Sequence, residues 1–494
     1  MFKNYKFVLS HSRSYLRGAL LAAGLACIVY VFTFIVEANL ALPLFLLLAG
    51  LVLTFVFFVY KPGYAAILLT LELILGGNGH WWHVPGTSIT PRYVFFVMFL
   101  LGYVIHKIFK REDRLPRILF SWPLLIFGAI IAGAVIHAVI SDNAEPYQEA
   151  QAWLYLLLYP IIVDLWRRRG IPLSILRAVV WSTLAMAIFQ LVLTLLLNIN
   201  GNISNILHDN TPLEAMRVTM PGTMLRYVFW GNSSLCGIVL AMALLVVRIG
   251  RGEIEIIPAP LMWGIAVIMS LAMIFSMTRS TWAQLVLTFM LVGLDFLVNR
   301  NMPWRLVAVT VVIVIGIIWL FSGAPFVREA LENRFETLLL DRSALDAGDS
   351  LVLKKTEQDQ LLAAIAANPS FGYGFGLGNY AEFGGELVED NRTRFHNYFL
   401  GFALKTGVVG LLSLLFLLFG GCLHAVRVGI LVSRDLPEQR NVLFGMAYGF
   451  AGVFLASVSN PHLGTPAVIV TFAFMLATAD LVFYQRRDRK ENEA

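Results

Sequence analysis

Charged residues are scarce in this sequence. They make up 14% of its 494 residues, whereas hydrophobic residues make up 58%. Soluble domains carry roughly 25% charged residues, so this chain cannot cover a water-facing surface with charge. The mean hydropathy of +0.75 agrees. An ordinary soluble protein is therefore excluded. The formal net charge of +6 does not indicate nucleic-acid binding, because the excess lies in short loops between apolar runs.

Cysteine is nearly absent as well. Cys27, Cys236 and Cys422 each lie in a different apolar run. An odd number of cysteines, all at membrane depth, argues against a disulfide framework. We therefore expect these three residues to serve in packing.

Motifs for common cofactors are also missing. The sequence has no Walker phosphate loop, and the glycines at 372, 374, 376 and 378 do not fit the dinucleotide fingerprint. It has no zinc-type set of Cys and His. It also has no Asp-x-Asp motif of the kind that holds sugar diphosphates through a cation. We expect a protein that works without a metal ion or a cofactor.

Long apolar runs dominate what is present. A membrane-spanning helix needs roughly 20 apolar residues. Two of the runs, 64–76 and 152–166, are short enough to be half-spans, so we predict 12 to 14 transmembrane helices. The candidate spans are 18–36, 40–60, 64–76, 93–109, 119–140, 152–166, 172–198, 231–249, 258–277, 281–298, 305–322, 398–426, 441–458 and 465–484.

The basic residues fix the expected orientation. When the spans are threaded alternately, nearly all Lys and Arg clusters of the short loops fall on one side, which the positive-inside rule makes cytoplasmic. Both termini are then cytoplasmic, and the first apolar run is an uncleaved signal-anchor. The sequence thus predicts an all-α integral membrane protein, with residues 1–494 forming one polytopic domain.

One large loop interrupts this pattern on the outer face. It covers 323–396 and contains two helix-like stretches, near 328–340 and 355–367. The second ends at Asn368-Pro369, a helix-stop signal. A turn-rich segment of alternating aromatic residues and glycines, 371–378, follows it. A smaller outer loop covers 199–225.

Two arginines are expected at the outer interface. Arg279 lies between two apolar runs with almost no loop, and Arg226 just precedes the run 231–249. A cation at such a depth is costly and indicates a functional site. The planar fork of arginine suits bidentate phosphate binding. The alternative for both is interfacial anchoring, with the side chain reaching the lipid headgroups.

His396 is the strongest candidate for proton transfer. It lies where the long outer loop re-enters the membrane, so we expect it at a helix N-terminus. The positive end of a helix disfavours an imidazolium, and a neutral histidine can accept a proton. The alternative role is a loop histidine that caps the helix.

Other polar residues are weaker candidates. Supporting roles are open for Asn397, Arg217, Arg334, Arg392 and Arg394, although solvated loop charge is the expected role for the arginines of the long loop. Acidic residues also lie in or beside the apolar runs. We expect Asp164, Asp295 and Asp480 to pair or to reach the cytoplasmic interface, and Glu72 is the one carboxyl placed for a proton relay. Interfacial arginines around one histidine suggest group transfer from a lipid-linked diphosphate.

Four motifs resemble the O-antigen ligase and polymerase superfamily, and together they cover 220–430. The first is His396-Asn397 followed after nine residues by Gly407, with Lys405–Gly410 resembling the stretch around that glycine. The others are the glycine-rich approach from Asn368 to Gly376, Thr278-Arg279-Ser280, and Arg226 followed by Gly231-Asn232. Thr278 stands where the family has Ser, and the neighbours of Arg226 match loosely.

The resemblance implies a metal-independent, inverting glycosyltransferase of the bacterial inner membrane, with its site facing the periplasm. Its donor would be a glycan on undecaprenyl diphosphate, and the acceptor a sugar hydroxyl of lipid A–core. His396 would activate the acceptor, and Arg279 and Arg226 would hold the diphosphate. No cofactor is implied. The partners are the two lipid-linked substrates and membrane lipids, and the sequence does not determine an oligomeric state.

Relatives that share these motifs leave the acceptor open. An O-antigen polymerase and a protein O-oligosaccharyltransferase would use the same donor. The modest loop 199–225 and the cytoplasmic end at 485–494 favour the ligase. Outside the enzyme class, a lipid or glycan transporter or flippase would depend on mid-membrane charge such as Glu72 rather than on His396.

Overall fold

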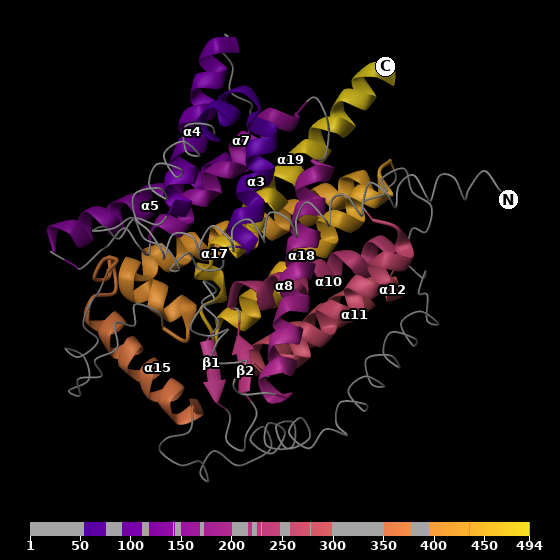
Figure 1. Cartoon of the computed structure of the whole chain (residues 1–494). Helices are drawn as coiled ribbons and strands as arrows, with labels where there is room; N and C mark the ends of the chain where they lie inside the picture. The colour runs from indigo at the N-terminus through magenta and orange to yellow at the C-terminus, as the bar shows by residue number, and fades with distance from the viewer. Residues whose placement is uncertain are drawn as a thin grey trace, which may run out of the picture. The chain divides into compact units, whose positions relative to one another are not determined.

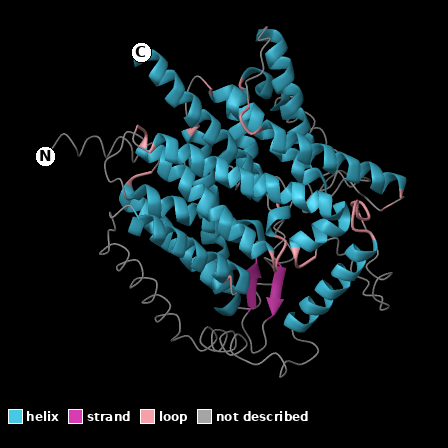
Figure 2. Cartoon of the chain, turned by 180° about the vertical axis from the view of Figure 1, so that it is seen from behind, coloured by secondary structure: helices cyan, strands magenta, loops and turns pink. Residues whose placement is uncertain are grey.

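The structure is a computed structural model, and its described residues are almost entirely helical. Figure 2 shows helices in cyan throughout, with one pair of strands in magenta. The described residues are 54–75, 91–110, 118–141, 143, 150–167, 172–199, 216–219, 225–228, 230–247, 257–276, 278–298, 350–376, 395–433 and 435–493.

The chain divides into two compact units. Unit 1 comprises Met1–Leu69 and Arg92–Asp113, and unit 2 comprises Thr70–Pro91 and Arg114–Ala494. In unit 1, the Phe58 and Phe99 rings meet edge to face with centroids 5.9 Å apart. All the candidate residues that the structure describes, including Glu72 of α3, belong to unit 2.

The element bounds follow the apolar runs closely (Figure 1). The helices are α3 (Pro62–Leu75), α4 (Pro91–Lys110), α5 (Ser121–Ile140), η1 (Gln151–Leu157), α7 (Leu158–Trp166), α8 (Leu173–Ile199), α10 (Trp230–Val247), α11 (Ala259–Phe275), α12 (Arg279–Val298), α15 (Ser350–Ala367), α17 (Tyr398–Val432), α18 (Pro437–Ser457), η3 (His462–Gly464) and α19 (Pro466–Glu493). The strands are β1 (Met216–Thr219) and β2 (Leu225–Val228).

The prediction of an all-α integral membrane protein is confirmed. Each predicted span that falls within the described residues corresponds to a helix. Six of the described helices are long and apolar enough to cross a membrane, and four shorter apolar ones accompany them. The spans 18–36 and 305–322, and most of 40–60, lie outside the described residues, so the total of 12 to 14 stays a prediction.

The loop regions differ from expectation in one place. The second predicted loop helix, 355–367, is confirmed as α15, which ends directly before Asn368-Pro369. The first, 328–340, lies outside the described residues. The loop 199–225 was not expected to contain strands, yet β1 and β2 pair antiparallel. Short segments with alternating side chains on either side of Pro221-Gly222 carry a hairpin signal that the strong helical pattern of the chain obscured.

In unit 2, α18 runs antiparallel to both α10 and α12. Arg440 at the start of α18 forms an ion pair of 2.7 Å with Asp295 near the end of α12. Asn441 donates 2.7 Å to the carbonyl of Leu245 at the end of α10. Beyond the other end of α18, Asn460 donates to Ser280 at the start of α12. We call these two ends of unit 2 the Asp295 end and the Ser280 end. The prediction that Asp295 is paired is confirmed.

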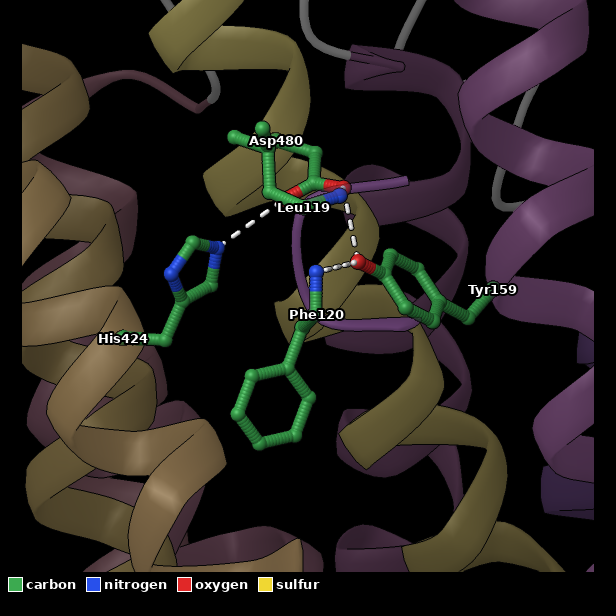
Figure 3. A network of polar contacts seen from close by, with 5 residues as sticks. All are labelled: Leu119, Phe120, Tyr159, His424 and Asp480. Carbon is green, nitrogen blue, oxygen red and sulfur yellow. Dashed lines mark hydrogen bonds and ion pairs between the residues drawn. The ribbon is translucent and has the colours of Figure 1, made fainter. Parts of the chain in front are cut away.

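Toward the Asp295 end, a buried carboxylate joins four segments (Figure 3). Asp480 of α19 accepts hydrogen bonds from the Tyr159 hydroxyl at 2.6 Å and the Leu119 amide at 2.9 Å. Its other oxygen pairs with His424 Nε2 of α17 at 2.9 Å. The Phe120 amide donates 3.1 Å to the same Tyr159 hydroxyl. Asp480 is fully buried, and it fixes the backbone directly before α5 through the Leu119 amide.

The long helix α17 is broken at Gly407. This residue has φ 70° and ψ −179°, a conformation that is essentially restricted to glycine. The glycine-rich segment fills the break. The amides of Tyr373 and Gly374 each donate 2.9 Å to the carbonyls of Leu404 and Lys405, and the Val408 amide donates 2.8 Å to the Pro369 carbonyl. The predicted turn-rich segment is thus confirmed, and its backbone takes the place of helical bonds that the break removes.

The break makes Gly407 intolerant of a side chain. A Cβ at this position would clash with the Ser370 carbonyl oxygen. We expect Gly407→Ala to lower the free energy of unfolding by about 1–3 kcal/mol from backbone strain alone. The measurement is the thermal unfolding midpoint in detergent. The matched control is Gly128→Ala in α5, where a Cβ meets nothing within 4 Å. Equal losses in both variants would contradict the assignment.

The Asp480 network predicts a second difference in stability. Asp480→Ala leaves Tyr159, His424 and the Leu119 amide without their buried acceptor, so we expect a loss of about 3–5 kcal/mol. Asp435→Ala removes a partly exposed pair with Arg486, 3.1 Å long, and should cost about 0–1 kcal/mol. Tryptophan fluorescence during thermal unfolding compares the two. A smaller loss for Asp480→Ala than for Asp435→Ala would refute the role of the network.

Candidate functional site

His396 is held by a carboxylate from the long loop. The Nδ1 atom of His396 lies 2.6 Å from Glu357 Oε2, and the His396 backbone amide donates 2.8 Å to Glu357 Oε1. An ionised carboxylate has no proton to donate, so Nδ1 carries the hydrogen and Nε2 is left as the basic nitrogen. The His396 side chain is 40% exposed and that of Glu357 only 16%. Glu357 therefore orients the ring through Nδ1, and the rest of the ring is partly accessible.

Apolar packing places Glu357 in this position. Leu361 and Ala364 of α15 form a buried cluster with Phe395 and Leu404. Glu357 lies one helical turn before Leu361, on the same face of α15. The face of α15 that packs against the start of α17 therefore also presents the carboxylate to His396.

Asn397 has a structural role at the next position. It is the N-cap of α17, and its side-chain oxygen accepts 3.2 Å from the Leu400 amide. His396 therefore directly precedes a capped helix, which confirms the predicted location at a helix N-terminus. The capping role that was an alternative for His396 belongs to Asn397. Because the cap hydrogen bond is made by Asn397, the His396 ring does not take part in capping and is available for other chemistry.

Arg279 begins α12 at the Ser280 end. The chain turns sharply between α11 and α12, where the Thr278 hydroxyl donates 3.1 Å to the Ser276 carbonyl and Trp282 Nε1 donates 3.0 Å to that of Ile274. The predicted hairpin is confirmed. The Nε atom of Arg279 is buried and has no hydrogen-bond partner in the part of the chain that the structure describes. An unpaired guanidinium nitrogen at a positive helix end is arranged for an anion.

The starts of α12 and α17 meet through the short helix η3. Tyr398, the first residue of α17, packs its ring against Gly464 of η3. On the other side of η3, the Nε2 atom of His462 lies 3.5 Å from the hydroxyl oxygen of Ser280, the residue that follows Arg279. His396 and Arg279 are 117 residues apart in sequence, yet both lie at the Ser280 end.

The remaining predicted arginines are placed less fully. Arg226 is in β2, paired in register with Val218, and Arg217 is in β1, paired with Tyr227. The structure describes only the backbone of these strands, and β2 contacts α8. Arg334, Arg392 and Arg394 lie outside the described residues. Their supporting roles stay predictions.

The arrangement favours proton abstraction beside a bound anion. His396 supplies a base whose orientation is fixed by Glu357, a pairing used wherever a histidine must present one nitrogen. Arg279 supplies positive charge where a leaving group could develop negative charge. Among the described residues, no group of three or more His, Cys, Asp or Glu gathers into a possible metal site.

Sequence reasoning missed three residues of this end: Glu357, Asn460 and His462. Glu357 is one of twelve acidic residues in the loop 323–396, and nothing in a single sequence distinguishes it from the others. Asn460 and His462 follow α18 in a short polar run between two apolar spans. That run is an available signal, because polar residues between closely spaced spans need partners.

The Glu357 contact predicts the tautomer of His396. In protein labelled with ¹⁵N-histidine, we expect His396 to be protonated at Nδ1 and unprotonated at Nε2, since the carboxylate accepts from Nδ1. Glu357→Gln should shift this equilibrium, whereas Asp359→Asn, at an exposed position of the same helix, should not. The spectrum of His396→Gln assigns the signal. An unchanged His396 signal in Glu357→Gln would contradict the contact.

The central part of the chain matches a known protein family. Residues 264–415 match the family model described as O-Antigen ligase. The match includes Arg279, Glu357 and His396, whereas Arg226, Asn460 and His462 lie outside it. No curated protein matches the chain. This central segment is therefore similar to the O-antigen ligase family.

Proposed function

We propose that this protein is an O-antigen ligase of the bacterial inner membrane, with its site at the Ser280 end facing the periplasm. It transfers a glycan from undecaprenyl diphosphate to a sugar hydroxyl of lipid A–core, without a metal ion and with inversion at the anomeric carbon. The single observation that carries the proposal is the His396–Glu357 pair beside the capped start of α17. The family match and the placement of Arg279 support it.

His396 acts as the general base in this scheme. Its Nε2 takes the proton from the acceptor hydroxyl as the oxygen attacks the anomeric carbon, and Glu357 stabilises the imidazolium that forms. The bond between the anomeric carbon and the diphosphate oxygen breaks, and its electron pair leaves with the diphosphate. Attack from the face opposite the leaving group gives inversion. The products are the glycosylated acceptor and undecaprenyl diphosphate.

Arg279 stabilises the leaving group. Its free Nε and the first amides of α12 provide positive potential for the diphosphate as charge develops on it. Arg226 is proposed as the second cation, brought to this end by the hairpin that precedes α10. A lipid-linked diphosphate fits this location, because phosphates of membrane lipids lie at the depth where membrane helices begin.

The rival function outside the enzyme class, a transporter or flippase, gains no support from the buried charges. Transporters place ionisable groups along a mid-membrane path. Here Asp295 is paired with Arg440, and Asp480 with His424 and Tyr159. Groups that are already satisfied favour a structural role over carriage of an ion. An O-antigen polymerase or a protein O-oligosaccharyltransferase would use the same site on a different acceptor.

Lipopolysaccharide banding on gels tests the proposal in cells that depend on this chain. We expect His396→Ala to reduce ligation by about 10²–10⁴-fold and Arg279→Ala by about 10²–10³-fold. Glu357→Gln should cost about 10²-fold, because the base loses its orientation. Each variant should leave bare lipid A–core while polyprenyl-linked polymer accumulates. Membrane levels of each variant are compared with wild type by immunoblot.

Controls separate the alternatives. Asp359→Asn, near Glu357 on the same helix, and Glu72→Ala should give normal ladders under the ligase proposal. Cores that carry a single repeat unit would identify a polymerase. If the site variants give normal lipopolysaccharide ladders but lack glycosylated proteins, the chain is a protein-glycosylating enzyme. Normal ladders in His396→Ala would refute the catalytic assignment, and loss in Glu72→Ala alone would favour transport.

A further inference from the structure

The connection between α18 and α19 carries polar residues that the proposed reaction does not use. Asn460 is 2% exposed and His462 is fully buried. The backbone around them is fixed: the Asn460 amide donates 3.1 Å to Ala456, and the His462 amide donates 2.8 Å to Asn460. The Thr465 hydroxyl donates 2.9 Å to the His462 carbonyl. This segment, 459–465, is therefore a rigid turn with its polar side chains directed inward.

On one side the turn holds the start of α12. Asn460 Nδ2 donates a hydrogen bond to the Ser280 hydroxyl oxygen. His462 Nε2 lies 3.5 Å from the same oxygen. Ser280 is itself buried and directly follows Arg279. Two buried partners on one hydroxyl fix both the position and the direction of the first turn of α12, since hydrogen bonds are directional.

On the other side the turn holds the start of α17. A Cβ at Gly464 would lie 2.9 Å from a ring carbon of Tyr398, so the tyrosine ring lies directly against the glycine backbone. The same ring stacks on Phe402 with centroids 6.1 Å apart. Tyr398 follows the His396-Asn397 pair, so its position and that of His396 are coupled. No larger residue than glycine fits at 464 without displacing Tyr398.

We propose that the segment 459–465 is a clamp that sets the position of Arg279 relative to His396, and that Asn460 and His462 are positioning residues for the reaction. The segment contacts both helix starts at once, and each contact is made one or two residues from the reacting group. The effect of the clamp on turnover rests on the proposed function. The clamp itself concerns only the separation of α12 and α17, which can be measured without any reaction.

Kinetics on purified enzyme test the consequence. We expect Asn460→Leu and His462→Leu each to lower turnover by about 10²-fold, the scale of a misplaced catalytic group. His462→Gln, which keeps an amide near Ser280, should recover most of the activity. In an Arg279→Ala background, Asn460→Leu should add little, because the clamp acts through Arg279. Additive losses, or failure of His462→Gln to recover activity, would show a general packing defect instead.

A distance measurement tests the clamp without any reaction. Spin labels at the exposed positions Val286 of α12 and Val409 of α17, in a chain whose three cysteines are replaced, report the separation of the two helices. Wild type should give one narrow distance distribution. Asn460→Leu and His462→Leu should broaden or shift it, and His462→Gln should restore it. The matched control is His106→Leu in unit 1, whose ring hydrogen-bonds to the Val59 carbonyl at 2.7 Å and which should leave the distribution unchanged.

The two readouts separate the two proposals. A broadened distribution in a chain that shows no ligase activity even as wild type would refute the proposed function and support the clamp. An unchanged distribution with unchanged turnover in both Leu variants would overturn the clamp and leave the proposed function standing. If a Leu variant does not fold, His462→Gln and Asn460→Asp are compared with wild type instead. Asn460→Asp loses the donor to Ser280 and should shift the distance distribution, whereas His462→Gln keeps a donor and should not.

Discussion

The break in α17 at Gly407 is the constraint on which the Ser280 end depends. A helix that opens within a membrane protein must satisfy its freed amides and carbonyls internally, because hydrocarbon offers no partner. Here the backbone of 369–374 supplies them. The same segment joins α15 to the rest of unit 2, so it fixes where α15 can lie. Together with the apolar packing of α15 on the start of α17, this segment places Glu357 beside His396.

Polar contacts are distributed unequally between the two ends of unit 2. At the Asp295 end, charges are paired: Asp295 with Arg440, and Asp480 with His424 and Tyr159. At the Ser280 end, Arg279 has a buried nitrogen with no hydrogen-bond partner among the described residues, and His396 has an exposed face. Buried charge is tolerated where it is satisfied, and an unsatisfied group marks the place where a ligand could complete the set. This contrast is the physical basis for assigning the site to the Ser280 end.

Much of the fold could be predicted because its signals are local. Span length, the stop at Asn368-Pro369 and the short turn before Arg279 depend on residues within one or two helical turns, and the structure confirms all three. The β1–β2 hairpin was missed because four-residue strands carry a weak signal beside long apolar runs. The candidate site was predicted only in part. His396 and Arg279 were identifiable by their unusual depth, whereas Glu357 is one acidic residue among many in its loop.

The sequence by itself determined that the chain is a helical membrane protein, which residues begin its helices, and that a histidine and an arginine lie at such starts. These follow from hydropathy and from local stop and cap signals, which act over a few residues. Only the tertiary structure decided that Glu357 orients His396, that Asn397 rather than His396 caps α17, and that η3 joins Arg279 to the same end. The Glu357 contact and the η3 contact join residues 39 and 182 positions apart. Their partners are chosen by how helices pack, which no short stretch of sequence encodes.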